Sequence, residues 1–184
     1  LCQAAGANCD DVTNALALAT DRIISPAYMK GGMGDGGGCH PRDNIAMSWL
    51  ARKHNLSCNL FDVIMRARED QTRYLAHLAI NYSVMHNLPI CIAGIAFKKG
   101  TRLIDGSCAL LLKNILWALG EPVMCWDPIV IPDDKFTEIP AIYVIGCNHR
   151  EVVEHFYPSG SVIIDPWGEV KDQLGVEVIR IGRA

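Results

Sequence analysis

A glycine-rich segment that runs into a cysteine, Gly34 to Asp43, carries the residues best suited to chemistry. Its consecutive glycines allow close approach to a ligand and positive φ, so they are expected to present Cys39 rather than bury it. Pro41 suits the first turn of a helix, and Asp43 is expected where that helix begins, at the end where the dipole favours a carboxylate. The same field favours a thiolate. The pattern indicates Cys39 as a nucleophile; a tight turn around a small apolar cysteine is the alternative.

The overall composition is that of an ordinary globular chain, with 184 residues of which 50% are hydrophobic and 20% charged. A net charge of -3 gives no reason to expect nucleic acid or an anionic membrane as a partner. The chain has no apolar run of about 18 residues that would span a membrane, and no signal-peptide layout. Because Leu1 starts within a helix-like pattern, we expect the chain to be a piece of a longer protein.

The eight cysteines form no Cys-x-x-Cys pair, so neither a disulfide framework nor a metal site is expected. Most of them lie inside apolar runs, as in Ile90-Cys91-Ile92. Buried single thiols of this kind are typical of a reducing compartment. The prediction is a cytoplasmic protein with no bound metal, in which Cys39 is the exception by its context.

Residues 43–87 show helical spacing of apolar side chains, interrupted near residues 55–59. The second part predicts one long amphipathic helix over Leu60 to His86. A helix of that length in a chain of this size often packs against a partner subunit.

Beyond Pro89 the pattern changes to short apolar runs that alternate with helical stretches. Strands are predicted in residues 90–97, 122–126, 141–145, 161–164 and 176–181, and helices in 107–119 and 150–156. This alternation predicts a parallel sheet covered on both faces, with ligands at the carboxyl ends of the strands. The expected fold class is therefore α/β, with a helical central segment (residues 1–88) followed by a Rossmann-like parallel-sheet domain (residues 89–184).

Chemistry-capable residues follow several of these strands. They are Phe97 and Lys98, Asp127, Cys147 to His149, and Asp165 to Trp167. The crevice is expected near Lys98, although a solvated turn is the alternative for that lysine, and His149 either approaches the ligand or is a satisfied structural residue. Since Gly94 to Gly100 lacks the Gly-x-Gly-x-x-Gly spacing, this domain alone is not a dinucleotide site.

Two motifs together carry a family resemblance. The loop Gly37-Gly38-Cys39-His40-Pro41-Arg42-Asp43 and the strand Gly94-Ile95-Ala96-Phe97-Lys98 resemble motifs of the UDP-glucose/GDP-mannose dehydrogenase family, in the same order and at about the same separation. The resemblance covers almost the whole chain but only the C-terminal half of the family's length. It implies NAD-dependent oxidation of a nucleotide-sugar C6 alcohol to a carboxylate. Cys39 would capture the intermediate aldehyde, and Asp43 would act as a base or position water.

The resemblance also implies binding residues and partners. The nucleotide-sugar contacts carried over are Arg22, Tyr28, Lys30, Gly34, Gly36, Phe97 and Lys98, and those beside NAD are Cys39, His40, Pro41 and Arg42. A homodimer through the 60–86 helix is expected. The NAD-binding domain of the family would precede Leu1.

Departures from the family pattern leave alternatives open. Asp105 stands where the family has an arginine that contacts NAD, so that contact is lost or supplied by Arg102. Asp165 to Gly168 stands where many members have Asp-Gly-Arg, and its Trp167 either borders the nucleotide or packs in a turn.

The sequence is compatible with three functions. The favoured one is a UDP-glucose 6-dehydrogenase, because Cys-His-Pro-Arg-Asp is nearer that type than the types acting on UDP-N-acetylhexosamines or GDP-mannose. The second is a non-catalytic nucleotide-sugar-binding or regulatory module. The third, a dimerisation module without a ligand, leaves the cysteine loop unexplained.

Overall fold

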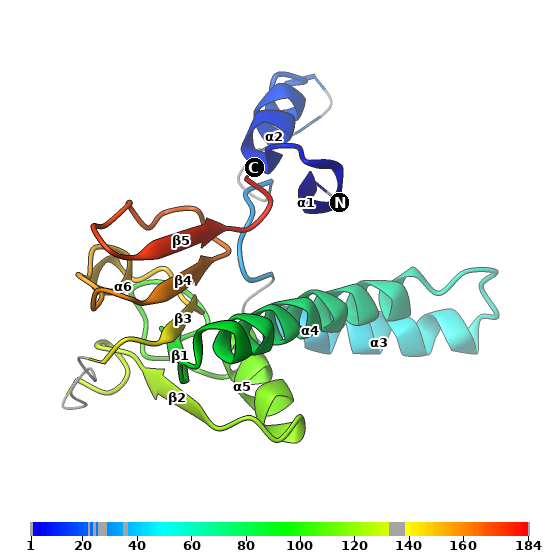
Figure 1. Ribbon diagram of the computed structural model, residues 1–184. Helices are drawn as coiled ribbons and strands as arrows, with labels where there is room; N and C mark the ends of the chain where they lie inside the picture. The colour runs from blue at the N-terminus through cyan, green and yellow to red at the C-terminus, as the bar shows by residue number, and fades with distance from the viewer. Residues whose placement is uncertain are drawn as a thin grey trace.

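The computed structural model describes residues 2–21, 23, 25, 29–34, 37–132 and 139–183 (Figure 1). Its elements in chain order are α1 (Cys2–Ala5), α2 (Cys9–Ala17), α3 (Cys39–Lys53), α4 (Leu60–His86), β1 (Ile90–Ala93), α5 (Cys108–Ala118), β2 (Val123–Trp126), β3 (Ile142–Ile145), α6 (Arg150–Val153), β4 (Val162–Asp165) and β5 (Glu177–Arg180). Among the described residues, no helix combines the length and apolar character needed to cross a membrane.

The five strands form one parallel sheet in the order β2-β1-β3-β4-β5. This confirms the predicted α/β class and each of the predicted strands. The predicted first strand was too long, because Gly94 takes a φ of 84° and ends the extended backbone at Ala93. The order reverses direction between β1 and β3, so the carboxyl ends of these two strands form the switch point where such sheets bind ligands.

Each face of the sheet is packed into its own apolar core. Ile90 and Ile92 of β1 point to the face covered by α4 and α5, where Leu112 and Leu116 are fully buried. Cys91 and the other alternate strand residues point to the second core. Because both faces are buried, the strands are apolar at almost every position instead of alternating with polar residues.

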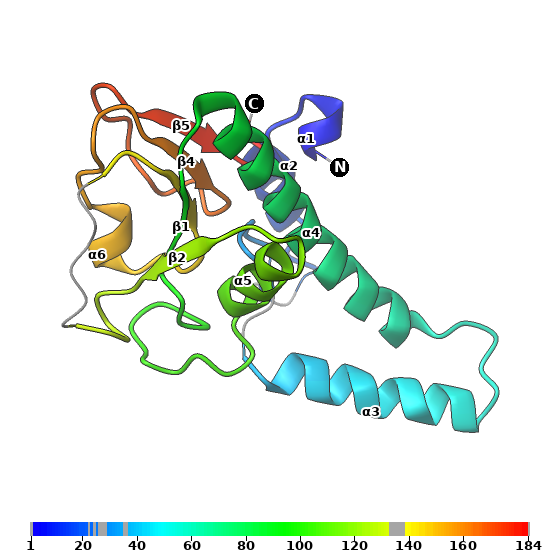
Figure 2. The same cartoon turned by 60° about the horizontal axis from the view of Figure 1, so that its bottom comes forward.

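The long helix α4 is present over the predicted residues, Leu60 to His86. It begins at Asn59, whose side chain accepts the Asp62 N–H, and ends at Asn87, which adopts the left-handed conformation common at helix C-termini. Its C-terminal half is buried on the sheet through residues such as Leu75 and Ala79. Its N-terminal half packs against α3, and Figure 2 shows these two segments extending away from the sheet.

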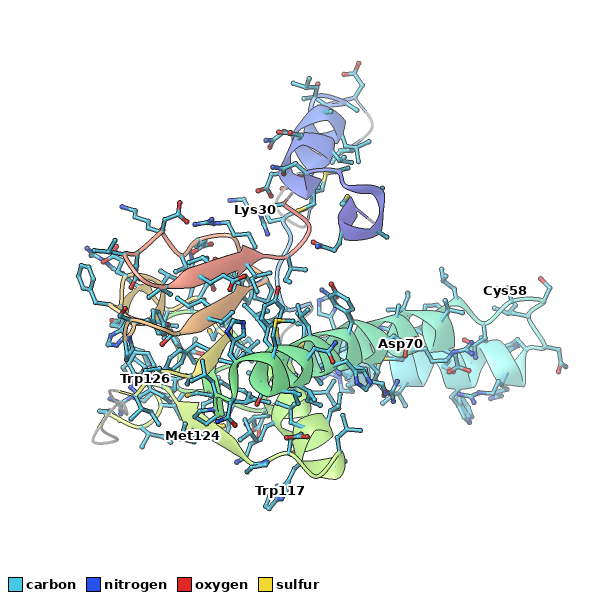
Figure 3. All side chains as sticks on the ribbon, viewed as in Figure 1. Lys30, Cys58, Asp70, Trp117, Met124 and Trp126 are labelled. Carbon is cyan, nitrogen blue, oxygen red and sulfur yellow. The ribbon has the colours of Figure 1, made fainter. Side chains whose placement is uncertain are left out.

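The α3–α4 hairpin, residues 39–86, is held partly by a polar cluster. The buried Ser48 hydroxyl donates to Asp62 and accepts from Asn59, and Arg52 lies 3.3 Å from the same aspartate. Cys58 lies in the loop at the far end of the hairpin (Figure 3). Large apolar side chains of both helices remain exposed, among them Ile45, Met47, Trp49, Leu60, Val63 and Ile64.

The first and last described segments are joined. Arg183 Nε donates to Asp10 of α2 at 2.6 Å, and the Gly182 N–H donates to Gln3 of α1 at 2.6 Å. The Cys9 N–H in turn donates to the Gly182 carbonyl. These bonds dock the N-terminal helices beside the end of β5, and the two ends of the chain accordingly lie close together in Figure 1.

Candidate functional site

Cys39 is exposed and is the first residue of α3, directly after Gly38. Pro41 occupies the first turn, as predicted, where its missing N–H needs no partner. The predicted position of Asp43 was wrong, since the helix begins four residues earlier and its first turn holds no acidic residue. The helix dipole therefore acts on Cys39 more directly than on Asp43.

Asp43 is instead paired with its neighbour. Arg42 Nε donates to Asp43 Oδ1 at 2.8 Å, and both side chains are largely exposed. This hydrogen bond, followed by the charges of Asp43 and Cys39, raises the pKa of Arg42. Arg42 is thus the cation that accompanies both acidic groups at the start of α3. His40, also in the first turn, is exposed and accepts at its carbonyl from Asn44.

The loop before Cys39 rests on the loop after β1. Gly37 has a φ of 88°, and its N–H donates to the Gly106 carbonyl at 3.3 Å. A Cβ on Gly37 would lie 3.3 Å from the Phe97 ring, and one on Gly106 would lie 2.6 Å from the Gly37 carbonyl oxygen. Arg68 Nη2 of α4 donates to the same Gly106 carbonyl at 3.4 Å. The structure therefore brings the Cys39 loop and Phe97 together.

The upstream glycines lie between α4 and the end of β4. A Cβ on Gly32 would lie 2.6 Å from Cζ3 of Trp167, so only glycine lets the backbone pass beneath this ring. Gln71 donates to the Gly32 carbonyl at 3.1 Å. Figure 3 shows Lys30 on the segment that runs from α2 toward the sheet, and its side chain is exposed. Gly34 follows on this segment, near Gln71. Arg22, Tyr28 and Gly36 lie outside the described residues.

A compact turn after β1 carries Phe97 and Lys98. The Phe97 N–H donates to the Leu103 carbonyl at 2.9 Å, and the Thr101 hydroxyl donates to the Lys98 carbonyl at 3.2 Å. Lys98 Nζ lies 5.4 Å from the Phe97 ring centroid, and the lysine is exposed. This arrangement places an aromatic face and a cation next to each other, a combination that suits a sugar or base joined to phosphate.

Asp127, predicted at the end of β2, is fully buried and joins two strand ends. Its Oδ2 accepts the N–H groups of Ile95 and Ala96, and its Oδ1 accepts those of Ile129 and Val130. Burial opposes ionisation, but the His149 imidazole and the backbone donors outweigh it, so the pKa of Asp127 lies well below its ordinary value. This carboxylate is structural.

His149 and Cys147, after β3, do not face a ligand either. Both are buried, and His149 Nδ1 accepts the Gly100 N–H at 3.1 Å while Nε2 lies 3.4 Å from Asp127 Oδ2. Burial, together with the charge of Asp127, raises the pKa of Cys147 to about 12. The structural interpretation of His149 is the correct one, and Cys147 is unsuited to nucleophilic attack.

Asp165 and Trp167, after β4, are likewise engaged. Asp165 accepts the N–H groups of Trp167, Gly168 and Val170, and Trp167 Nε1 donates to the Ile145 carbonyl at 3.1 Å. Trp167 therefore packs in a turn, where it supports the Gly32 backbone.

The contacts of Arg68, Gln71 and Trp167 with the glycine loop were not predicted. The one usable signal was the spacing of Arg68 and Gln71, three residues apart and so on one face of the predicted helix. The described residues contain no group of His, Cys, Asp or Glu that could hold a metal ion.

Comparison with known proteins identifies relatives that cover nearly the whole chain. Residues 1–70 match the model of the UDP-glucose/GDP-mannose dehydrogenase family, central domain. The chain is 28% identical to the UDP-glucose 6-dehydrogenase TuaD of Bacillus subtilis (strain 168) over 97% of its own length and 38% of that protein. It thus spans less than half of this relative.

The solved structures that share the fold include two dehydrogenases. A UDP-glucose dehydrogenase from the hyperthermophilic archaeon Pyrobaculum islandicum matches with a TM-score of 0.77 and 20% identity, over 97% of this chain and 44% of the other. The UDP-D-ManNAc dehydrogenase of Pyrococcus horikoshii matches with a TM-score of 0.72 and 22% identity, over 99% of this chain and 46% of the other.

Proposed function

We propose that this chain, whose residues 1–70 match the central-domain model of the UDP-glucose/GDP-mannose dehydrogenase family, supplies the catalytic thiol and the nucleotide-sugar site of an NAD-dependent nucleotide-sugar 6-dehydrogenase, with UDP-glucose preferred. The observation that carries the proposal is the position of Gly37, which donates its N–H to the Gly106 carbonyl and lies so near Phe97 that a Cβ would be 3.3 Å from the ring. It joins the loop of an exposed thiol to the turn that presents Lys98, at the switch point of the sheet.

Cys39 is proposed to act on the intermediate aldehyde. Its thiolate sulfur adds to the aldehyde carbon, forming a C–S bond while the carbonyl oxygen takes up a proton. After this adduct is oxidised to a thioester, water cleaves the C–S bond, which releases the carboxylate and returns the thiol. Exposure of Cys39 at the start of α3 supports this role, because a substrate aldehyde can reach its sulfur.

Asp43 is proposed as the base that takes a proton from the attacking water. Its side chain lies one turn along α3 from Cys39 and is 65% exposed, so water reaches it freely. The hydrogen bond from Arg42 fixes the direction of the carboxylate. Replacement of Arg42 would then alter thioester hydrolysis more than addition of the thiol.

Phe97 and Lys98 are proposed to bind the nucleotide sugar, with the lysine against the diphosphate and the ring against sugar or base. Lys30 and Gly34 join them because the segment 29–34 crosses the same edge of the sheet. The family resemblance adds Arg22, Tyr28 and Gly36 to this proposal.

The described residues do not form a complete site for NAD, the hydride acceptor in this family's reaction. Gly94 is pressed against the Cys147 backbone, and α5 begins only at Cys108. The turn after β1 therefore does not lead directly into a helix N-terminus, as a pyrophosphate cradle requires. Only His40, Pro41, Arg42 and Cys39 are proposed to lie beside NAD, whose other contacts would come from residues outside this chain.

Calorimetric titration with UDP-glucose, UDP-N-acetylglucosamine and GDP-mannose tests the binding site. We expect saturable binding of UDP-glucose, weakened about tenfold by Lys98→Ala, because a charged contact to phosphate is lost. Lys99→Ala is the matched control, since it removes the adjacent exposed lysine and should leave affinity unchanged within about twofold. Equal effects of the two substitutions would reduce Lys98 to part of a general positive potential.

Turnover tests the thiol, in the protein at its full natural length with NADH formation as the readout. Cys39→Ala should abolish carboxylate formation, whereas Cys58→Ala removes the other exposed cysteine and should leave it intact. Nucleotide-sugar binding without turnover in the unaltered protein would instead favour a non-catalytic binding or regulatory module. The carboxylate of Asp105, exposed where the family has an arginine, is the observation that keeps this second function in view.

We also propose that a second copy of the chain covers the exposed apolar residues of the α3–α4 hairpin, forming a homodimer. Ile64→Glu should shift the mass in solution to that of one chain, whereas Val84→Glu, at the other end of α4, should not.

The eight free cysteines support a cytoplasmic location. In the proposed division at residue 88, residues 1–88 carry the thiol and residues 89–184 bind the nucleotide, although the end of α4 shares the core of the sheet.

A further inference from the structure

We propose that His149 is a positioning residue for the nucleotide-sugar site: by accepting the Gly100 N–H it fixes the turn that presents Phe97 and Lys98. This inference rests on the proposed role of Lys98 in binding phosphate. The sequence left His149 open as a ligand contact, but its side chain is completely buried and acts through the backbone of the turn.

The position of His149 is set by tight packing at the switch point. A Cβ on Gly94 would lie 2.8 Å from the Cys147 nitrogen, and one on Gly146 would collide with the Gly94 carbonyl oxygen. The ends of β1 and β3 therefore meet backbone to backbone. This contact holds the start of the loop that carries His149 against the end of β1, from which the turn with Gly100 begins.

The two ring nitrogens of His149 face different partners. Because Nδ1 accepts the Gly100 N–H at 3.1 Å, Nδ1 carries no proton, and in the neutral ring the proton is on Nε2. Nε2 lies 3.4 Å from Asp127 Oδ2 but is not aligned as a hydrogen bond, and it has no hydrogen-bond partner among the described residues. Nε2 therefore contributes little, because the Asp127 oxygen that it faces already accepts the N–H groups of Ile95 and Ala96.

Nδ1 of His149 holds the turn after β1 through its hydrogen bond from the Gly100 N–H. Gly100 has a φ of 75° and is exposed, so its backbone would otherwise be free to rearrange in solvent. Asp127 fixes the start of this segment through the Ile95 and Ala96 N–H groups, and His149 fixes its far side. Lys98 lies between these two anchors, so its backbone is ordered before a ligand arrives.

Two substitutions separate this role from general support of the fold. Asn matches the half of the imidazole that carries Nδ1, so His149→Asn keeps an acceptor for the Gly100 N–H, whereas His149→Gln moves the amide away from it. We expect His149→Gln to weaken UDP binding about fivefold to tenfold, and His149→Asn to stay within about twofold of the unaltered protein. A loss of equal size in both variants would overturn the proposal.

A double-mutant cycle with Lys98→Ala distinguishes this inference from the proposed function. If His149 acts through Lys98, the double variant His149→Gln/Lys98→Ala should bind UDP no more weakly than Lys98→Ala alone, within about twofold. Full additivity would overturn the positioning role while leaving the role of Lys98 intact. If Lys98→Ala itself has no effect on UDP binding, the proposed phosphate contact fails instead.

Amide hydrogen exchange provides a test that does not depend on a folded variant. In the unaltered protein the Gly100 N–H should exchange at least about tenfold more slowly than expected for an exposed turn, because it is bonded to a buried ring. Exchange at the rate of an unprotected amide would overturn the inference.

Discussion

The parallel sheet and the α3–α4 hairpin are stabilised in different ways. In the sheet, both faces are buried and even the polar residues at the strand ends, Asp127 and Asp165, are enclosed and supplied with backbone donors. In the hairpin, a polar cluster around Ser48 joins the helices while apolar side chains such as Trp49 and Ile64 face outward. The interior of the sheet region is therefore apolar on both faces of the sheet, whereas the two helices of the hairpin expose several apolar side chains along their length.

The glycine-rich loop depends on both regions. Gly37 donates to Gly106, which belongs to the sheet side, and Arg68 of α4 donates to the same carbonyl. The thiol of Cys39 is therefore placed where a rigid region and a hairpin with an exposed apolar surface meet. Substitutions in the sheet or in the hairpin should therefore both affect the Cys39 loop, but to different extents.

The largest expected difference is between two leucines. Leu112 of α5 is fully buried against the sheet, so Leu112→Ala should lower the free energy of unfolding by about 3 kcal/mol. Leu60 of α4 is 57% exposed, so Leu60→Ala should cost less than about 0.5 kcal/mol. Urea denaturation measures both. A cost for Leu60→Ala that grows with protein concentration would indicate that a second copy covers the hairpin.

The same contrast explains how well the fold could be predicted. The strands β1 to β4 are short, mostly apolar runs flanked by glycine or proline, and their burial follows from these local patterns. The long helix α4 was equally clear. The start of α3 was misplaced because no apolar periodicity precedes Asp43, and the helix is instead begun by Gly38 with Pro41 in its first turn.

The second prediction concerns the buried carboxylate of the sheet. Because the pKa of Asp127 is lower in the folded than in the unfolded chain, its contribution to stability is complete above the unfolded pKa and is lost as the pH falls below about 4. Asp127→Asn should lower the free energy of unfolding by about 2 to 3 kcal/mol at pH 7, by removing charged hydrogen bonds. Unfolding measured between pH 3 and 7 should show a steeper acid loss in the unaltered protein. Parallel pH curves would contradict the depressed pKa.

The sequence indicated candidate site residues one by one, but it did not indicate the side chains that support them. Cys39, Phe97 and Lys98 stand out because glycines and strand ends flank them. The supports act through backbone atoms: His149 holds an N–H, and Arg68 holds a carbonyl. A sequence without a fold does not indicate which distant backbone group a side chain will meet.

The third prediction compares two neighbouring glycines at the junction. Gly37 has a φ of 88° and a Phe97 ring beside it, so Gly37→Ala should strain the loop by about 1 to 2 kcal/mol and displace Cys39. Gly38 has a φ of −78° and open space around it, so Gly38→Ala should be nearly neutral. The rate of Cys39 alkylation and the thermal midpoint measure these effects. Equal effects of the two substitutions would show that the conformation of the loop depends on the start of α3 and not on the packing of Gly37 against Phe97.

The smallest expected effect lies in the hairpin. Ser48→Ala removes a hydroxyl that donates to Asp62 and accepts from Arg52 and Asn59. Because Asp62 and Arg52 are partly exposed and can regain water, the cost should be about 1 kcal/mol, below that of Asp127→Asn. Ser57→Ala, in the exposed loop of the same hairpin, is the control and should be neutral.

Measuring the UDP affinity of Ser48→Ala shows whether the loss of stability in the hairpin also changes the binding site. If the sheet alone sets the Lys98 turn, Ser48→Ala should lower stability and leave UDP affinity within about twofold. A larger loss of affinity would mean that the hairpin, through Arg68 and the Gly106 carbonyl, helps to hold the binding turn as well as the thiol loop. The two regions would then act as one unit at the site despite their different interiors.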